Sequence, residues 1–216
     1  MLSFRFTGYL ALRFLRMGLL LSTIILPCYA YSASKTILVL GDSLSAEYGL
    51  ARGQGWVNLL SEKLRSEKTG MEVVNASISG ETTSGGKNRL PALIEKHKPD
   101  VVIIELGGND ALRGLSLKAS DDNLHAMIQL AKLNKAKVLL VGMQIPPNYG
   151  KEYTEAFTSL FQKIAKEQKI SLVPFLLEGI ANNPSMFQQD RIHPIAAAHP
   201  LILNNVWPML TPIIKK

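Results

Sequence analysis

The chain has 216 residues, of which 47% are apolar and 19% charged, and its formal net charge is +7. This length and apolar content are enough to bury a core, which excludes a disordered protein or a low-complexity fibre. The single cysteine, Cys28, excludes an intramolecular disulfide and a cysteine-based metal cluster. Lysines and arginines do not cluster with aromatic residues, so we expect no nucleic-acid partner.

Residues 1–30 have the pattern of a secretory signal peptide. Three arginines and no acidic residue precede the apolar run Met17–Leu26, and Ala30 and Ala33 offer cleavage points near residues 30–33. The run is shorter than the roughly 20 residues of a membrane-spanning helix, which disfavours an anchor. A lipoprotein acylated at Cys28 is disfavoured because Pro27 stands where a small residue is needed. We therefore expect a periplasmic or secreted protein, with residues 34–216 forming a single domain.

Short apolar runs alternate with helical patterns along the rest of the chain. Strands are predicted at Thr36–Leu40, Val73–Ala76, Val101–Leu106, Val138–Met143 and Leu172–Phe175, each apolar on both faces. Helices are predicted at Gly55–Glu67, Gly86–Lys98, Asp121–Asn134, Lys151–Gln168 and Ala196–Leu210, with Asp121 and Asp122 capping the third. Strands that are apolar throughout are typical of a parallel sheet covered by helices on both faces. We therefore expect a three-layer α/β fold with about five parallel strands.

Polar residues follow directly after the first three predicted strands. These segments are Gly41–Ser45, Ser77–Thr82 and Gly107–Asp110, and the carboxyl ends of parallel strands share one edge of a sheet. A fourth polar segment, Asp190–Pro194, precedes the last predicted helix and is free to reach the same edge. We therefore expect a hydroxyl, an imidazole and a carboxylate to meet there.

Ser43, His193 and Asp190 form a complete set for nucleophilic catalysis. A serine nucleophile needs a base within hydrogen-bond reach and a third group that orients the base. Asp190 lies three residues before His193, so its carboxylate can reach Nδ1 and leave Nε2 to accept the serine proton. Candidate donors to the oxyanion are the backbone N–H groups of Ser43 and Gly80 and the side-chain amide of Asn109. The chain lacks a Gly-x-Ser-x-Gly motif, which disfavours the α/β-hydrolase fold.

Each of these motifs, taken alone, is also common in turns without a function. Several nearby residues are likewise better explained by a structural role than by a catalytic one. Asp42 is expected to hold its turn through hydrogen bonds to backbone N–H groups, and Asp110 to support its loop. His97, His125 and His199 need no function. We predict neither a metal nor another cofactor, because cysteine ligands and helical i, i+4 histidine pairs are missing.

Two apolar segments near these motifs leave two interpretations open. Ala111–Leu117 follows Asn109, and Ile145–Tyr149 contains two prolines. The segments either cradle an acyl chain or pack back onto the core. If they cradle a chain, the substrate-binding residues are Ala111, Leu112, Gly114, Leu115, Pro147 and Tyr149. Gly114 would then let its segment move, whereas the prolines favour a rigid wall.

The four polar blocks resemble, in order, those of the GDSL or SGNH hydrolases. The blocks are Gly41-Asp42-Ser43-Leu44, Gly80, Gly107-Gly108-Asn109-Asp110 and Asp190-x-x-His193, within a resemblance that runs from Thr36 to Pro208. Flanking residues are similar to the bacterial periplasmic thioesterase, lysophospholipase and arylesterase branch. The resemblance implies a flavodoxin-like sheet of order 2-1-3-4-5, the triad Ser43, Asp190 and His193, and an oxyanion hole completed by Gly80 and Asn109. Arg191 and Ile195 replace the Gly and Asn that relatives often carry, which indicates a different leaving-group side of the pocket.

The leading hypothesis is a serine hydrolase that cleaves lysophospholipids, fatty acyl thioesters or aryl esters through an acyl-enzyme. We expect a monomer without cofactor that acts on small-molecule substrates and makes weak contact with lipid headgroups. The alternative is a carbohydrate or peptidoglycan acetylesterase, against which the apolar Ala111–Leu117 segment argues. A non-catalytic lipid- or nucleotide-binding protein is less favoured. It would not need the triad, and the phosphate-binding glycine fingerprints are missing.

Overall fold

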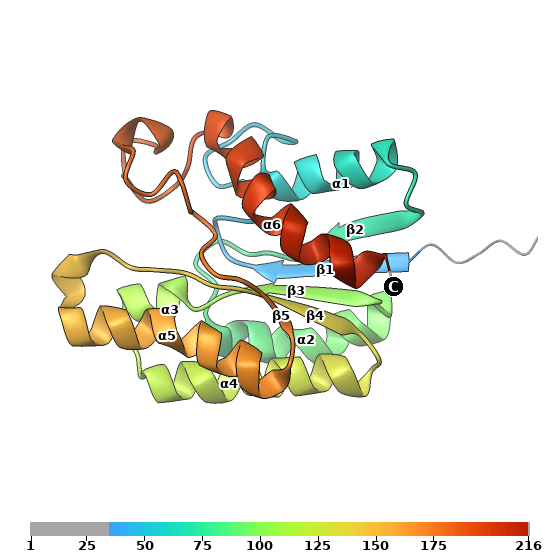
Figure 1. Ribbon diagram of the computed structural model, residues 1–216, viewed down its shortest axis with the longest axis horizontal. Helices are drawn as coiled ribbons and strands as arrows, with labels where there is room; N and C mark the ends of the chain where they lie inside the picture. The colour runs from blue at the N-terminus through green and yellow to red at the C-terminus, as the bar shows by residue number, and fades with distance from the viewer. Residues whose placement is uncertain (1–34, 216) are drawn as a thin grey trace, which may run out of the picture. The chain divides into compact units, whose positions relative to one another are not determined.

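A computed structural model describes residues 35–215 of the chain (Figure 1). The predicted signal peptide lies outside these described residues. The strands are β1 (Lys35–Gly41), β2 (Met71–Asn75), β3 (Val101–Glu105), β4 (Lys137–Val141) and β5 (Ser171–Val173). They are all parallel and lie in the order β2-β1-β3-β4-β5. The predicted fold class and strand order are therefore confirmed.

Helices cover both faces of this sheet. Figure 1 shows α1 (Trp56–Ser66) and α6 (His199–Ile214) on one face, and α2 (Thr83–His97), α4 (Leu117–Leu133) and α5 (Lys151–Gln168) on the other. The short helix α3 (Gly108–Leu112) follows β3, and 3₁₀ turns lie at Pro147–Tyr149, Pro184–Met186 and Ala196–Ala198. None of the helices within the described residues is long and apolar enough to span a bilayer.

The core surrounds the three central strands. Every residue of β3 is buried, and Trp56 of α1 and Phe157 and Phe161 of α5 are among the largest fully buried side chains. Burial of this apolar surface, at roughly 25 cal/mol per Å², is the main term that stabilises the sheet. The central strands therefore form a rigid base for the residues that follow them.

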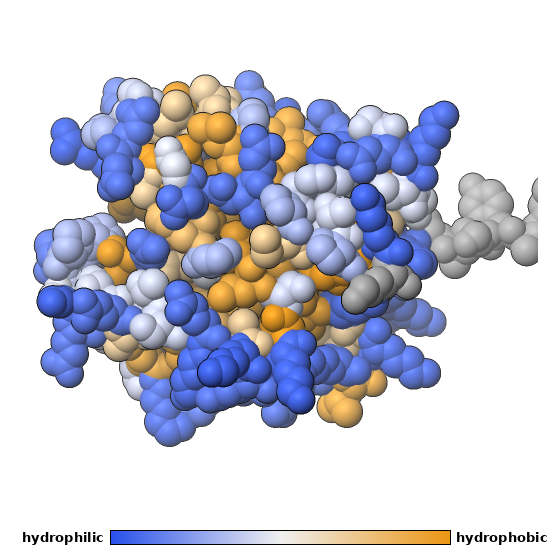
Figure 2. All heavy atoms as spheres, viewed as in Figure 1, coloured by the Kyte–Doolittle hydropathy of each residue, from blue (hydrophilic) through white to orange (hydrophobic). Residues whose placement is uncertain are grey.

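The two edge strands are less buried than the sequence predicts. Residues of β2 and β5 are mostly half-buried or exposed, because a neighbouring strand covers only one side of each. Figure 2 shows apolar side chains at the surface between α5 and α6, where β5 lies. The prediction of five strands buried on both faces is therefore wrong for β2 and β5. The shortness of β5 limits the edge that is open to pairing with another chain.

The beginning of α4 also differs from the prediction. The helix starts four residues earlier because Ser116 is its N-cap, with Oγ accepting the N–H of Ala119. Asp121 and Asp122 therefore lie inside the helix, and Asp121 pairs with Lys163 of α5 at 3.2 Å. These carboxylates make lateral ion pairs and do not cap the helix.

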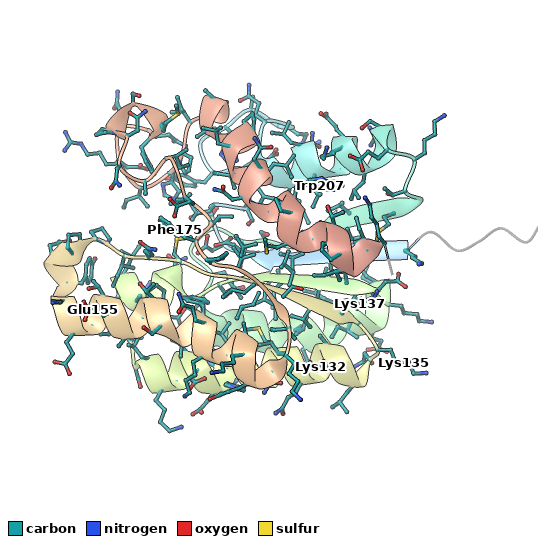
Figure 3. All side chains as sticks on the ribbon, viewed as in Figure 1. Lys132, Lys135, Lys137, Glu155, Phe175 and Trp207 are labelled. Carbon is teal, nitrogen blue, oxygen red and sulfur yellow. The ribbon has the colours of Figure 1, made fainter. Side chains whose placement is uncertain are left out.

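A hollow of about 390 Å³ lies where β4 and β5 begin, at the opposite end of the strands from the polar segments. Figure 3 shows Lys132, Lys135 and Lys137 near this end. The ammonium of Lys137 donates to the Ile213 carbonyl at 2.7 Å, and that of Lys132 donates to the Gln168 carbonyl. Cations at the carbonyl ends of α5 and α6 stabilise these helices, so Lys132 and Lys137 have a structural role.

Candidate active site

Ser43, His193 and Asp190 lie in hydrogen-bond contact at the carboxyl ends of the strands. Ser43 Oγ is 2.9 Å from His193 Nε2, and Asp190 Oδ2 is 2.7 Å from Nδ1. Asp190 Oδ1 also accepts the backbone N–H groups of His193 and Ile192, at 3.0 and 2.9 Å. These bonds, led by that of the His193 N–H, lower the pKa of Asp190 to about 2. The carboxylate is therefore ionised and able to orient the imidazole.

The segment Asp190–His193 belongs to a hairpin-like loop that lies outside the sheet. The Gln188 N–H donates to the His193 carbonyl at 2.7 Å, and Phe187 and Pro194 form an isolated antiparallel bridge. Gln188 Nε2 also donates to the carbonyl of Tyr48 at 2.9 Å. This bond ties the loop to the segment that carries Ser43.

Ser43 itself lies in a tight turn directly after β1. The N–H groups of Ser45 and Ala46 donate to the Asp42 carbonyl at 3.2 and 2.9 Å, and the Leu44 N–H donates to Asp42 Oδ1 at 3.0 Å. The predicted role of Asp42 in holding this turn is therefore confirmed.

Gly80 and Asn109 follow the strands on either side of β1. Gly80 has φ +79° in the turn Ile78–Glu81, in which the Glu81 N–H donates to the Ile78 carbonyl at 3.1 Å. Asn109 Nδ2 donates to Asp42 Oδ2 at 2.9 Å and to the Glu81 carbonyl at 3.0 Å. Its amide thus joins the segments after β1 and β2. Among residues 35–215, no group accepts the backbone N–H of Ser43 or Gly80, so both are available to a ligand.

A buried acidic pair lies beneath the Ser43 turn. Glu105 at the end of β3 is the register partner of Gly41, where an added Cβ would lie 2.8 Å from Glu105 Oε2. Burial raises the pKa of Glu105 well above its usual range, and the adjacent Asp42 raises it further. Burial also raises the pKa of Asp42 to about 6, although the Leu44 N–H opposes the shift. Glu105 was not among the site residues predicted from the sequence. The feature that could have indicated it is an acidic residue at the end of an otherwise apolar strand.

A second buried network anchors α3, the helix that carries Asn109. Asp110 Oδ2 accepts the Thr83 N–H at 2.9 Å, and Asp110 Oδ1 accepts the Thr83 hydroxyl at 2.6 Å. Asn123 of α4 donates to the same hydroxyl at 3.1 Å. Asp110 therefore links α3 to α2 and α4, which confirms its predicted supporting role.

The six expected substrate-binding residues divide between the core and the surface. Ala111 is fully buried on α3, and Leu112 packs partly against the core. The other four residues are exposed at the surface: Gly114, Leu115, Pro147 and Tyr149. Tyr149 Oη donates to the Leu112 carbonyl at 3.2 Å, so the two segments lie side by side. The predicted apolar loop is in fact the end of α3 with a short turn before α4, and this geometry turns Ala111 into the core.

Two of the other histidines, His199 and His125, make contacts that support the fold. His199 Nδ1 accepts the N–H of Trp56 at 3.0 Å at the start of α1, and burial lowers the pKa of His199. His125 lies between the carboxylates of Asp121 and Glu167. In the part of the chain that the structure describes, no three His, Cys, Asp or Glu side chains are grouped as metal ligands.

Comparison with known proteins places this geometry in a family. The model of the GDSL-like lipase/acylhydrolase family matches residues 39–201. The chain belongs to this family. It is 51% identical to esterase TesA of Pseudomonas aeruginosa over 183 residues, which are 85% of this chain and 91% of that protein.

Two further known proteins are similar to this chain over most of their length. Thioesterase 1/protease 1/lysophospholipase L1 of Escherichia coli is 40% identical over 191 residues, 88% of this chain and 90% of that protein. The structure of the psychrotrophic esterase EstA of a Pseudoalteromonas species, inhibited by monoethylphosphonate, is 41% identical with a TM-score of 0.80. It matches 84% of this chain and 100% of EstA. The resemblance predicted from the sequence is confirmed, and the chain is a hydrolase of acyl esters.

Proposed function

We propose that this hydrolase cleaves acyl esters and thioesters through an acyl-enzyme formed on Ser43. The observation that carries the proposal is the 2.9 Å contact between Ser43 Oγ and His193 Nε2, with Asp190 against the other ring nitrogen. An ionised Asp190 favours the imidazole tautomer with its hydrogen on Nδ1, which leaves Nε2 free to accept a proton. Ser43 is then the nucleophile, His193 the base and Asp190 the orienting acid.

The reaction has two half-reactions with the same proton carrier. His193 takes the hydroxyl proton as Ser43 Oγ attacks the acyl carbon, and gives that proton to the leaving alcohol or thiol. Water then loses a proton to His193 and attacks the acyl carbon, and the acid leaves as Ser43 regains its proton. Each half-reaction ends with a neutral imidazole, so the cycle needs no cofactor.

The proposed oxyanion donors are the N–H groups of Ser43 and Gly80 and the amide of Asn109. One Asn109 Nδ2 hydrogen goes to Asp42 and the other to the carbonyl of Glu81. A charged oxyanion is a stronger acceptor than that carbonyl and would displace it. Such a donor contributes roughly 10²–10³ to the rate.

The names of the relatives indicate substrates with ester or thioester bonds to acyl chains. We propose that the acyl chain lies along the exposed surface of Leu115 and Tyr149, beside Leu112, Gly114 and Pro147. Leu115 and Tyr149 are 44% and 38% exposed and so offer apolar surface to a ligand. Ala111 is not included because its side chain is buried.

We also propose which part of the chain forms the mature enzyme and where that enzyme acts. Residues 1–30 would be a signal peptide and residues 34–216 a single domain, active as a periplasmic or secreted monomer with weak contact to lipid headgroups. N-terminal sequencing of the protein recovered from the periplasm tests the first part. A mature terminus near residues 30–33 is expected, whereas an intact Met1 would contradict cleavage.

A fluorophosphonate probe tests the nucleophile. We expect the wild type to be labelled and Ser43→Ala to be neither labelled nor active, with an unchanged circular dichroism spectrum. Labelling that survives Ser43→Ala would remove Ser43 from this role, and an unlabelled wild type would favour a binding protein. A panel of p-nitrophenyl and CoA esters from acetyl to palmitoyl would then give the acyl preference. An optimum at acetyl would favour the acetylesterase alternative.

A further inference from the structure

The carboxyl group that holds Asn109 lies next to a second buried acid. Asp42 is 3% exposed and Glu105 is 2% exposed, and the Asp42 N–H donates to Glu105 Oε2 at 3.3 Å. Two carboxyl groups so close together in a buried site do not both ionise, because like charges repel strongly away from water. One of these two side chains therefore carries a proton.

The surrounding donors indicate which acid carries that proton. Asp42 accepts the Leu44 N–H at Oδ1 and the Asn109 amide at Oδ2, at 3.0 and 2.9 Å, as an ionised carboxylate does. Glu105 accepts the Ser45 hydroxyl at 2.7 Å and the Asp42 N–H at 3.3 Å, both at Oε2. Its Oε1 is thus left to carry the hydrogen. Burial, which raises the pKa of Glu105 well above its usual range, acts in the same direction.

We propose that Glu105 is a neutral acid whose hydrogen bond to Asp42 positions the Asn109 amide for the oxyanion. The inference rests on the proposed function, in which Asn109 is an oxyanion donor. Asp42 Oδ2 contacts Asn109 Nδ2 directly, so a shift of the carboxylate moves the amide. Glu105 contacts neither the substrate nor the reacting atoms and is therefore a positioning residue.

Glu105 also links the site to α1 through Ser45. Trp56 Nε1 donates to Ser45 Oγ at 3.2 Å, and that hydroxyl donates to Glu105. A buried chain of hydrogen bonds thus runs from Trp56 through Ser45, Glu105 and Asp42 to Asn109. An apolar residue at position 105 would fill the same space but leave Asp42 without this donor. Asp42 would then be free to rotate toward other donors.

Two substitutions at one position separate a neutral donor from an ionised acid. Glu105→Gln keeps a donor and an acceptor without charge, whereas Glu105→Leu removes both. We expect Glu105→Gln to retain kcat within about threefold. Glu105→Leu should lower kcat by about tenfold to a hundredfold with little change in KM, because misplacing a group by about 1 Å costs up to that amount. Steady-state kinetics with a p-nitrophenyl ester measures both constants.

A matched control separates positioning from loss of stability. Leu64→Ala removes a fully buried side chain near the end of α1, far from the carboxyl ends of the strands. It should lower the free energy of unfolding while kcat per folded molecule stays at the wild-type value. Equal loss of kcat in Glu105→Gln and Glu105→Leu would mean that a charged carboxylate is required. Wild-type kcat in Glu105→Leu would mean that Glu105 only fills space. Either outcome overturns the proposal.

Infrared spectroscopy reads the protonation state without relying on activity. We expect the wild type to show a protonated-carboxyl band at neutral pH and Glu105→Gln to lack that band. If the wild type lacks the band, the proposal is overturned. This test does not need Glu105→Leu to fold. Ser43→Ala separates failure of the proposed function from failure of the proposed role of Glu105. If it keeps turnover, the proposed function fails. If it abolishes turnover while Glu105→Leu stays fully active, only the role of Glu105 fails.

Discussion

The ring of Tyr48 lies against the imidazole of His193, with the two centroids 4.2 Å apart and the planes inclined by 36°. Tyr48 is 49% exposed, whereas the His193 side chain that it contacts is only 17% exposed. Gln188 Nε2 supports this arrangement by donating to the carbonyls of Tyr48 and Pro194, at 2.9 and 3.2 Å. The imidazole is therefore restrained by Asp190 at its edge and by Tyr48 on its face.

Truncation of Tyr48 should slow the reaction without removing it. An aromatic pair contributes about 0.5–1.5 kcal/mol, so Tyr48→Ala should lower kcat by roughly twofold to tenfold as the imidazole becomes less restrained. Tyr48→Phe keeps the ring and should behave like the wild type. Steady-state kinetics of the two variants checks this. Equal activity of Tyr48→Ala and Tyr48→Phe would show that the ring contact does not orient His193.

Removal of the Asn109 amide should affect the chemical step. A hydrogen bond to the oxyanion is stronger in the transition state than in the ground state, so Asn109→Ala should lower kcat by about 10²–10³. KM should change little. Stopped-flow measurement of acylation with a p-nitrophenyl ester separates the chemical step from product release. A variant that raises KM alone would place Asn109 in substrate binding and not in the oxyanion hole.

Arg191 occupies a backbone conformation that suits glycine. Its φ of +58° lies in the left-handed region, which costs a residue with a Cβ about 1 kcal/mol or more. Arg191→Gly should therefore raise the free energy of unfolding by about 0.5–1 kcal/mol, since the flexibility of glycine in the unfolded chain offsets part of the gain. Arg191→Ala keeps the Cβ and should bring no such gain. Urea denaturation of the three proteins compares these values.

The protonated Glu105 should make stability depend on pH. Its pKa in the folded state is raised above the ordinary value of 4.5, so folding takes up a proton, and stability falls as pH rises from about 4.5 toward the folded-state pKa. Glu105→Gln lacks this titration. The variant should gain on the wild type by up to about 1.4 kcal/mol per pH unit in this window.

The comparison with Glu105→Gln is needed because other groups titrate in the opposite direction. Burial lowers the pKa of His199, so this residue destabilises the fold as pH falls below its unfolded value of 6.5. The His199 effect is common to both proteins and cancels in their difference. Asp42, whose pKa burial raises to about 6, titrates together with the adjacent Glu105, so the difference reports on this acidic pair. Denaturant unfolding at pH about 5, 7 and 9 measures the difference. A constant difference would show that Glu105 is ionised in the folded protein.

The strands were predictable because local apolar runs determine them, and their order was expected from the resemblance to the GDSL or SGNH hydrolases. The ends of the helices were less predictable than the strands. The N-terminus of α4 was misplaced because Asp121 and Ser116 are both good capping residues, and only the fold selects between them. The short helix α3 was missed because Gly107 and Gly108 indicate a loop. These errors arose where two local signals compete.

The polar blocks of the site were predictable from strand ends, but the acid beneath them was not. Glu105 is beside Asp42 because β1 and β3 pair with Gly41 opposite Glu105, and register is a property of two distant segments. The same holds for Tyr48, whose contact with His193 depends on how one loop folds over another. Sequence reasoning therefore brought together the residues for which a catalytic role is proposed, but it missed Glu105 and Tyr48, which contact them from other segments of the chain.

The hairpin-like loop from Met186 to Ile195 gives the site a modular construction. The hydroxyl of Ser43 and the proposed oxyanion donors follow strands of the sheet, whereas the imidazole of His193 and the carboxylate of Asp190 lie together on one loop. Exchange of this loop between two related enzymes would transfer the surroundings of the departing alcohol or thiol as one unit. The acyl half of the site would stay as it is, so the two ends of a substrate are open to separate evolution.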